Sequence, residues 1–324
     1  MTGLLIGAYG ADMEGTAVGI SYARSASAGL VMTGRGPECP SPSWLERRGD
    51  RLVATLEGTG ELAWFARTPD GWRADGVTDL AGRWPCHAAF LDDDTVAVAC
   101  YGDGAVVVAR HGETAPAQRL DGAGSGPLPA QDGPHAHRVH PLPDGRVLTL
   151  DLGADRVHIH ERTADGLLRR TGELALPDGA APRDLLPLAS GRLVLLGEWS
   201  DALFVLEPSG DGFAIVQSLV LPGATPGADQ AAALGLSDDG RFLYAGIRGA
   251  DRIAVVACAD DRLSAVGWVP SGGRWPRHLF VDGGLLHVAH QNSDGIASFR
   301  LGADGMPELL GVAATPSPSC IIAD

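Results

Sequence analysis

Residues 133–161 read GPHAHRVHPLPDGRVLTLDLGADRVHIHE, and this stretch decides the fold. Apolar and polar residues alternate along the runs 135–142, 146–152 and 156–160, as they do in half-buried β-strands. Pro-Asp-Gly and Gly-Ala-Asp separate these runs, and both tripeptides favour tight turns because proline restricts φ and glycine accepts a positive φ. A further run, 167–176, follows an Asp-Gly pair. The sequence therefore predicts a four-stranded antiparallel meander.

The same unit recurs along the chain. Its clearest landmark is a proline, or in one case an aspartate, just before the first strand of each unit. These landmarks lie 42 to 49 residues apart, at Pro42, Pro85, Pro134, Pro182, Asp229, Pro276 and Pro318. A repeat of this length that is made of four short strands indicates a β-propeller, in which each unit is one blade.

A second landmark is the turn between the second and third strands of each unit. In each unit, the residue just before this turn is followed by an apolar residue at the fifth position after it. This holds for GTGEL after Glu57, GDGAV after Tyr101, GADRV after Leu152, WSDAL after Glu198, GADRI after Arg248 and NSDGI after Gln291. The shared offset supports one repeated hairpin geometry.

The two ends of the chain each hold part of one unit. Pro318 is followed by enough residues for one strand, and residues 4–8 read as a second strand without a first. We therefore expect the C-terminal strand to pair with residues 4–8. The predicted fold class is all-β, a seven-bladed β-propeller of four-stranded antiparallel blades that this pairing closes. Because each blade packs on its neighbours, we expect residues 1–324 to form a single domain.

Composition argues against several classes of function. The formal net charge of −15 is unfavourable for binding nucleic acid or an anionic membrane. All 25 cationic residues are arginines, so the chain has neither a Schiff-base lysine nor a P-loop lysine. The motifs of serine hydrolases, zinc proteases and dinucleotide-binding folds do not occur in the sequence.

Cysteines and histidines do not predict a metal site or a disulfide framework. The five cysteines are widely spaced, with no C-x-x-C pair. His135 and His137 form one H-x-H pair, and His158 and His160 form another, but no third ligand has a recognisable spacing. We expect no metal and no cofactor, and a structural or solvent-facing role for His158 and His160. The apparent lack of a secretory leader and of any membrane-spanning apolar run predicts a cytoplasmic protein.

In an antiparallel meander, the residues that open the first strand lie at the same end as those that close the second strand. The first set is Ser43, His87, His135, His137, Arg183, Gln230 and Arg277, and the second is Glu57, Tyr101, Leu152, Glu198, Arg248 and Gln291. In a propeller, both sets are expected at one mouth of the central channel, where arginine forks would suit a phosphate or a carboxylate. Ion pairing between these arginines and glutamates is the structural alternative.

Several motifs follow one another at blade spacing over the whole chain. They are LIGAY at 5–9, SPSWL at 41–45, PCH at 85–87 with CYGDG at 100–104, GPHAH at 133–137 with DLGADRV at 151–157, PR at 182–183 with Glu198, RFLY at 241–244 with Arg248, and WPR at 275–277 with QNSD at 291–294. With these motifs the chain resembles the lactonase-type seven-bladed propellers, the 6-phosphogluconolactonase family that includes a fungal carboxymuconate cyclase. The sequence departs from the usual asparagine and acidic positions of that family at Cys100, Gly197, Ile247, His290 and Ala233.

The resemblance implies a set of site residues. His135, Arg183, Glu198 and Arg248 match the positions proposed as catalytic in the cyclase. Glu198 or His135 is the implied base, and the two arginines are implied to bind an oxyanion or a carboxylate. Arg277 and His87 are the implied binding residues, and the expected position at the channel mouth adds Glu57, Tyr101, His137 and Gln291 as candidate substrate-binding residues.

The resemblance also implies a function, a lactone hydrolase of carbohydrate metabolism that opens 6-phosphogluconolactone or a related sugar lactone with activated water. The expected partner is a small anionic lactone, without nucleic acid or membrane. Two alternatives stay open. One is a cycloisomerase or lyase that acts on a carboxylated lactone at the same site. The other is a non-catalytic propeller that binds only a ligand or a protein partner.

Overall fold

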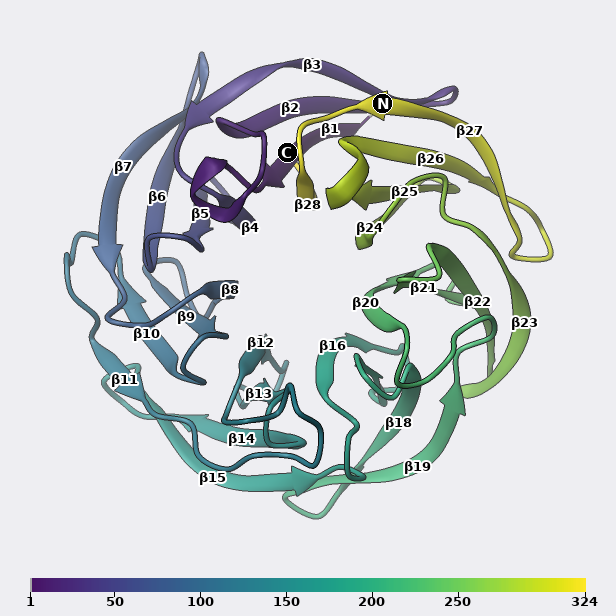
Figure 1. The fold of residues 1–324 in the computed structure, drawn as a ribbon. Coiled ribbons are helices and arrows are strands. Elements are labelled where there is room, and N and C mark those ends of the chain that lie inside the picture. The colour runs from purple at the N-terminus through teal and green to yellow at the C-terminus, as the bar shows by residue number, and fades with distance from the viewer. Residues whose placement is uncertain (1) are drawn as a thin grey trace. The chain divides into compact units, whose positions relative to one another are not determined.

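The computed structural model describes residues 2–324, and its regular structure is almost entirely β-sheet (Figure 1). The exceptions in this part of the chain are two 3₁₀ turns, Ala11–Met13 and Gln291–Ser293. No helix within residues 2–324 has the length and apolar character needed to cross a membrane. Strands β1 to β28 form seven four-stranded sheets. This arrangement confirms the predicted fold class, an all-β chain of seven four-stranded blades.

Contacts divide the chain into two compact units. The first unit contains residues up to 6, residues 21–34 and residues 183–324. The second unit contains residues 7–20 and 35–182. Each unit is described by itself, and the expected single domain stays a prediction.

Four sheets lie wholly or mostly in the first unit. The strands of each sheet are named in the order in which they are hydrogen-bonded. The strands are β28 (Pro318–Ala323), β1 (Thr2–Ala8), β2 (Gly19–Ala26) and β3 (Gly29–Glu38); β16 (Pro182–Pro187), β17 (Leu193–Gly197), β18 (Ala202–Ser209) and β19 (Gly212–Val220); β20 (Gln230–Leu236), β21 (Phe242–Arg248), β22 (Arg252–Ala259) and β23 (Arg262–Pro270); and β24 (Pro276–Asp282), β25 (Leu285–His290), β26 (Gly295–Leu301) and β27 (Pro307–Ala314). The C-terminal strand β28 lies beside β1, and the Asp324 N–H donates to Gly3 O at 2.8 Å. The predicted pairing of the two chain ends is therefore confirmed.

The second unit holds the remaining three sheets. Their strands are β4 (Pro42–Arg48), β5 (Arg51–Leu56), β6 (Glu61–Thr68) and β7 (Gly71–Asp79); β8 (Pro85–Phe90), β9 (Thr95–Cys100), β10 (Val106–Arg110) and β11 (Gln118–Leu120); and β12 (Ala136–Pro141), β13 (Val147–Asp151), β14 (Arg156–Arg162) and β15 (Leu168–Ala175). The strands β12 to β15 match the meander expected from residues 133–176 to within about two residues at each end.

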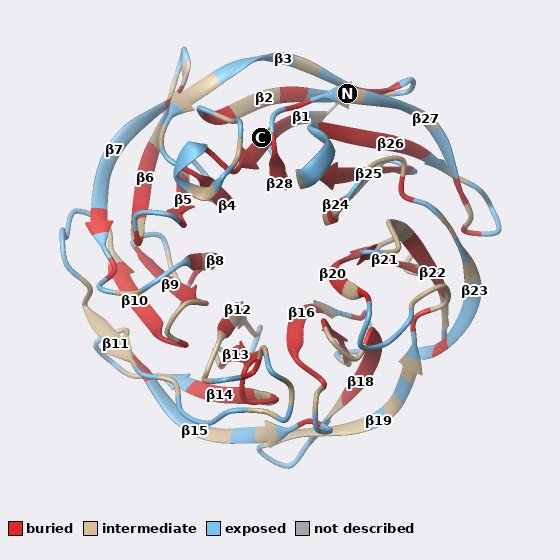
Figure 2. Ribbon diagram, viewed as in Figure 1, coloured by how far each residue is buried: buried red, intermediate tan, exposed pale blue. Residues whose placement is uncertain are grey.

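Burial follows strand position within each sheet, as Figure 2 shows for the largely buried β18 and the largely uncovered β19. Every residue of β17 is buried, whereas β19 alternates between half-buried and exposed residues along most of its length. In the first unit, Leu196, Leu203 and Leu243 belong to one apolar cluster that joins the β16–β19 sheet to the β20–β23 sheet. Each such buried side chain contributes about 1.5–3 kcal/mol relative to exposure, so this packing positions the strand ends that carry the site.

Candidate functional site

An ion-pair cluster lies in the first unit at the ends of three strands. Arg183 is the second residue of β16, Glu198 directly follows β17, and Arg248 closes β21. Arg183 Nη1 donates to Glu198 Oε2, and Arg248 Nη2 lies 2.9 Å from Glu198 Oε1. All three residues are at most 7% exposed. We call this group the arginine–glutamate cluster.

Backbone carbonyls of β20 hold both guanidinium groups of the cluster. Arg183 Nε donates to Ala232 O at 2.8 Å, and Arg248 Nε donates to Gln230 O at 3.1 Å. The Trp275 ring packs against Arg248, with 5.2 Å between the guanidinium carbon and the ring centroid, a favourable cation–π distance. The cluster is therefore built from neighbouring sheets and is held in one geometry.

The charges of the cluster decide which chemistry it suits. Burial raises the pKa of Glu198, but Arg248 and Arg183 together lower it more, so the pKa lies below its ordinary value. Glu198 is thus ionised at neutral pH and is a weak base. Burial lowers the pKa of Arg248 to about 10; Glu198 opposes this effect, and repulsion by Arg183 and Arg277 adds to it. Arg183, Arg248 and Arg277 together with the Glu198 carboxylate carry a net charge of +2, which favours an anionic ligand.

Two further predicted residues lie in the first unit beside this cluster. Arg277 is the second residue of β24 and is near enough to Arg248 to lower its pKa. Gln291 begins the 3₁₀ turn after β25, and its N–H donates to Trp275 O at 3.3 Å. Its Oε1 atom is buried and accepts no hydrogen bond from residues 2–324.

In the second unit, His135 is held in one tautomer by Tyr101. His135 Nδ1 lies 2.8 Å from Tyr101 O, and the two rings stack with centroids 4.5 Å apart. Because a carbonyl oxygen can only accept, Nδ1 carries the hydrogen, and Nε2 is then the basic nitrogen of the neutral ring. Nε2 lies 3.3 Å from Oδ1 of the exposed Asp132. His137 meets the edge of Tyr101 at 6.0 Å. Because a carboxylate oxygen can only accept, the contact with Asp132 forms when Nε2 is protonated, and His135 can act as a base only when Nε2 has released that hydrogen.

Aromatic residues also fix the other two predicted residues of the second unit. The Tyr9 hydroxyl donates to Glu57 Oε2 at 2.9 Å, and Glu57 is buried. The His87 ring packs on Trp44 with centroids 4.2 Å apart, and His87 Nδ1 accepts the Val139 N–H at 3.4 Å. Glu57 and His87 are therefore held by Tyr9 and Trp44, two residues that the quoted motifs contain but to which the sequence analysis assigned no role.

The sequence analysis missed three aromatic residues that support the candidate site: Tyr9, Trp44 and Trp275. Each one stands within a motif quoted above, Trp275 directly before a proline landmark and Trp44 two positions after another. A tryptophan close to a proline landmark, as at Trp44 and Trp275, could therefore have indicated a residue that supports the site. The first unit brings Arg183, Glu198 and Arg248 into contact. The second unit brings Tyr101 beside His135 and His137. The convergence of all the predicted residues at one channel mouth stays a prediction.

The second histidine pair lies in a buried, non-metal setting. No group of three His, Cys, Asp or Glu side chains within residues 2–324 is placed to hold a metal ion. His158 lies 3.9 Å from Asp151 and 3.6 Å from Glu173. His160 Nε2 is 2.9 Å from Thr149 Oγ1, and burial lowers the His160 pKa to about 3. These contacts suit a structural role for both rings.

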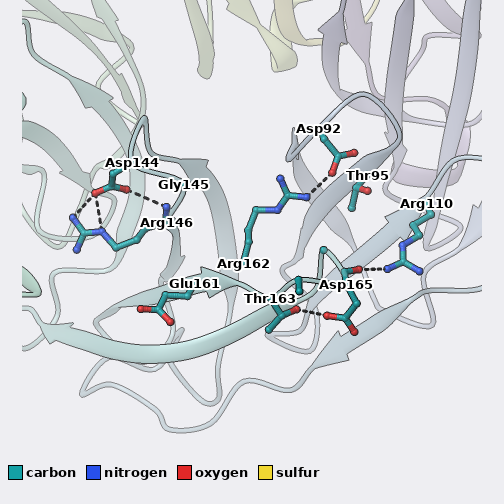
Figure 3. A pocket seen from close by; sticks show the side chains of 12 residues that line it. Asp92, Thr95, Arg110, Asp144, Gly145, Arg146, Glu161, Arg162, Thr163 and Asp165 are labelled. Atoms are coloured by element: carbon teal, nitrogen blue, oxygen red, sulfur yellow. Dashed lines mark hydrogen bonds and ion pairs between the residues drawn. The ribbon is translucent and has the colours of Figure 1, made fainter.

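A pocket of about 840 Å³ lies elsewhere in the second unit, among turns of the β8–β11 and β12–β15 sheets (Figure 3). None of the predicted site residues lines it. Its arginines already have protein partners: Arg162 pairs with Asp92, Arg146 pairs with Asp144 at 2.8 Å, and Arg110 donates to Asp165 O at 2.6 Å. These internal contacts make the pocket a weaker candidate than the arginine–glutamate cluster.

Comparisons with known proteins agree with this architecture. The family model described as "Lactonase, 7-bladed beta-propeller" matches residues 3–323. A protein of Lactococcus lactis is 34% identical over 184 residues, and the match covers 54% of this chain and 54% of that relative, about half its length. The 6-phosphogluconolactonase of Bacillus subtilis is 28% identical over 258 residues, which cover 75% and 74% of the two chains. The solved structure of a periplasmic gluconolactonase of Pseudomonas aeruginosa is similar with a TM-score of 0.91 at 27% identity, over 99% and 98% of the chains.

Proposed function

The chain belongs to the lactonase family of seven-bladed β-propellers, and we propose that it hydrolyses a lactone that carries an anionic group. The observation that carries this proposal is the buried arginine–glutamate cluster. In a chain of net charge −15, this cluster together with Arg277 gathers an excess of positive charge. Such a concentration of guanidinium groups favours a phosphate or carboxylate ligand.

The proposed substrate is 6-phosphogluconolactone or a related sugar lactone. The similar protein of Bacillus subtilis is named as a 6-phosphogluconolactonase, and the similar protein of Pseudomonas aeruginosa is named as a gluconolactonase. The net charge of +2 at the cluster and Arg277 supports the phosphorylated lactone over the neutral one. A phosphate monoester carries a charge of about −1.5 to −2 at neutral pH, which this site would balance.

The proposed reaction begins when a base takes a proton from water and the water oxygen attacks the lactone carbonyl carbon. The carbonyl π bond opens to an oxyanion, and we assign the stabilisation of its charge to the guanidinium groups of the arginine–glutamate cluster. When the carbonyl re-forms, the ring C–O bond breaks, and the leaving oxygen takes the proton back to become a hydroxyl. We assign the base to His135, whose Nε2 is the basic nitrogen. Glu198 is the second candidate, but both of its oxygens already bind arginines.

The test is a lactone panel followed by pH-stat and by mass spectrometry in H₂¹⁸O. We expect acid release and incorporation of one ¹⁸O atom, faster with a phosphorylated lactone than with gluconolactone. Conversion of a carboxylated lactone without ¹⁸O would instead identify a cycloisomerase or lyase. Binding of these lactones without turnover would identify a non-catalytic propeller.

We also propose a cytoplasmic location. All five cysteines are free thiols, as is usual in a reducing compartment. The relative from Pseudomonas aeruginosa is described as periplasmic, so fractionation of the native cells is the appropriate test. Recovery with periplasmic markers would contradict the proposal.

A further inference from the structure

Aspartates in the turns between second and third strands make a recurring contact. Asp155, Asp251 and Asp294 all have a positive φ, between 50° and 54°. The Oδ1 atom of each accepts the backbone N–H of the residue before the next first strand along the chain. These pairs are Asp155 with Ala181 at 2.7 Å, Asp251 with Trp275 at 2.7 Å and Asp294 with Ser317 at 2.8 Å. We call this contact the aspartate latch.

Asp201 occupies the same turn position, but its latch is not made. Its φ is 46°, and its side chain is fully buried. Neither carboxyl oxygen accepts a hydrogen bond of ordinary length and angle within residues 2–324. The residue before β20 is Asp229, and its N–H donates to Thr225 O at 3.1 Å instead. Asp201 is therefore a buried acid without the latch, and the segment before β20 ends in a second acid, Asp229.

The groups that act on Asp201 lie at four places in the first unit: after β17, before β20, in β20 and at the end of β21. Burial raises the pKa of Asp201 to about 7, and the Asp229 carboxylate, in the segment before β20, adds to this effect. The Ala231 N–H on β20 and Arg248 at the end of β21 lower the pKa, and Glu198 after β17 raises it. The Ala231 N–H is also the donor to Glu198 O at 3.0 Å. The Asp201 carboxyl group is therefore attracted by Arg248 and repelled by Asp229 and Glu198.

The segment 221–229 is fastened to this turn mainly through its backbone. The Leu221 N–H donates to Asp201 O at 2.8 Å, and the Gly227 N–H reaches Trp199 O at 3.3 Å. The segment also touches the end of β21, because a Cβ added to Gly249 would lie 2.9 Å from Asp229 Oδ1. Gly249 directly follows Arg248, so a shift of the segment 221–229 would change the position of Arg248 in the arginine–glutamate cluster.

We propose that Asp201 is a protonation switch for the segment 221–229. As a neutral acid, Asp201 tolerates Asp229 and lets the segment pack beside Gly249. As a carboxylate, it repels Asp229 and loosens the segment, together with the Gln230 carbonyl that accepts from Arg248. Because this inference concerns local stability, it holds whether or not the chain hydrolyses a lactone.

The expected sign follows from proton linkage. The pKa of Asp201 in the folded chain lies above the ordinary value for aspartate, about 3.9. The folded state therefore binds the proton more tightly than the unfolded state, and this group makes stability fall as pH rises between those two pKa values. Above the folded pKa the full destabilisation is present. Replacing Asp201 with a residue that does not ionise should therefore raise the stability of the folded chain most at alkaline pH.

The test compares Asp201→Asn with wild type at pH 5 and pH 8 by thermal melting and by hydrogen exchange of residues 221–229, corrected for the intrinsic exchange rate. We expect the Tm difference in favour of the variant to be several degrees larger at pH 8 than at pH 5, where only the first part of the destabilisation is present. Exchange of the segment should rise from pH 5 to pH 8 in wild type and not in the variant.

Two variants keep the test decisive. Asp251→Asn is the matched control, because the Asp251 Oδ1 atom accepts the Trp275 N–H and the asparagine Oδ1 atom can still accept it; its Tm difference from wild type should be the same at pH 5 and pH 8. Asp229→Asn removes the repelling charge and should reduce the pH dependence of wild type, even if Asp201→Asn does not fold. If Asp201→Asn behaves like Asp251→Asn, or if Asp229→Asn keeps the full wild-type pH dependence, the switch is refuted.

Discussion

Replacing Glu198 with glutamine tests whether the arginine–glutamate cluster is mainly a structural ion pair or holds the catalytic base. Glu198 is 5% exposed, and each carboxyl oxygen binds a different arginine. Glutamine has nearly the same shape but no charge, so the variant leaves two buried guanidinium groups without their counter-ion. The perturbation is therefore electrostatic rather than steric.

The magnitude follows from the burial of the cluster. Removing one partner of a buried ion pair costs about 3–5 kcal/mol, because the remaining charge stays desolvated. This is a large share of a typical free energy of unfolding of about 5–15 kcal/mol. At roughly 2–4 °C per kcal/mol, the expected fall in Tm at pH 7 is about 6–20 °C.

The assay is thermal melting together with turnover per folded molecule on the same preparations. The matched control is Glu207→Gln, because Arg192 and Glu207 pair over the same 15-residue spacing with much greater exposure. Solvent screens that pair, and we expect no measurable change in its Tm. The pKa of Glu198 is lowered in the folded chain, so its contribution is complete above the unfolded pKa of about 4.3 and is lost as pH falls through the folded pKa. The Tm gap between wild type and Glu198→Gln should therefore narrow in acid.

An unchanged Tm for Glu198→Gln would refute this reasoning. An unchanged Tm combined with a loss of turnover of about 10²–10⁴-fold would in addition identify Glu198 as the general base. A lowered Tm with near-normal turnover per folded molecule would support His135 in that role.

Four further predictions address the base, the anion site, the fold and the metal. His135→Asn should lower turnover by about 10²–10⁴-fold with little change in Tm, and normal turnover would exclude it as the base. Arg183→Ala should lower kcat/KM by about 10²–10³-fold, and Arg183→Lys should restore only part of it because an ammonium group lacks the planar fork; full restoration by lysine would contradict that geometry. Deleting residues 317–324 removes the buried Cys320 and Ile321 and exposes an edge of β1, so Tm or solubility should fall markedly, and an unchanged Tm would contradict the pairing. Activity should survive exhaustive chelation with EDTA, and loss that a divalent ion reverses would overturn the metal-free mechanism.

Much of the fold could be predicted because its signals are local. Alternation of period two and the turn tripeptides identified β12 to β15 to within about two residues. The proline landmarks coincide with strand starts at Pro42, Pro85, Pro182 and Pro276. One part of the site was local as well. The register of a single hairpin brings Arg183 and Glu198 to the same end of one sheet, and their spacing of 15 residues is enough to expect it.

The sequence by itself determined the repeat, the strands, the pairing of the chain ends and the residue types available to the site. Only the tertiary structure decided their chemical state. Glu198 is a weak base because Arg248 arrives from another sheet, and His135 presents Nε2 because Tyr101 O occupies Nδ1. Asp201 has the same turn and the same residue type as Asp251, yet it alone of these two lacks the latch. Burial and electrostatic potential depend on groups that lie close in space but far apart along the chain, so they cannot be predicted from a local sequence pattern.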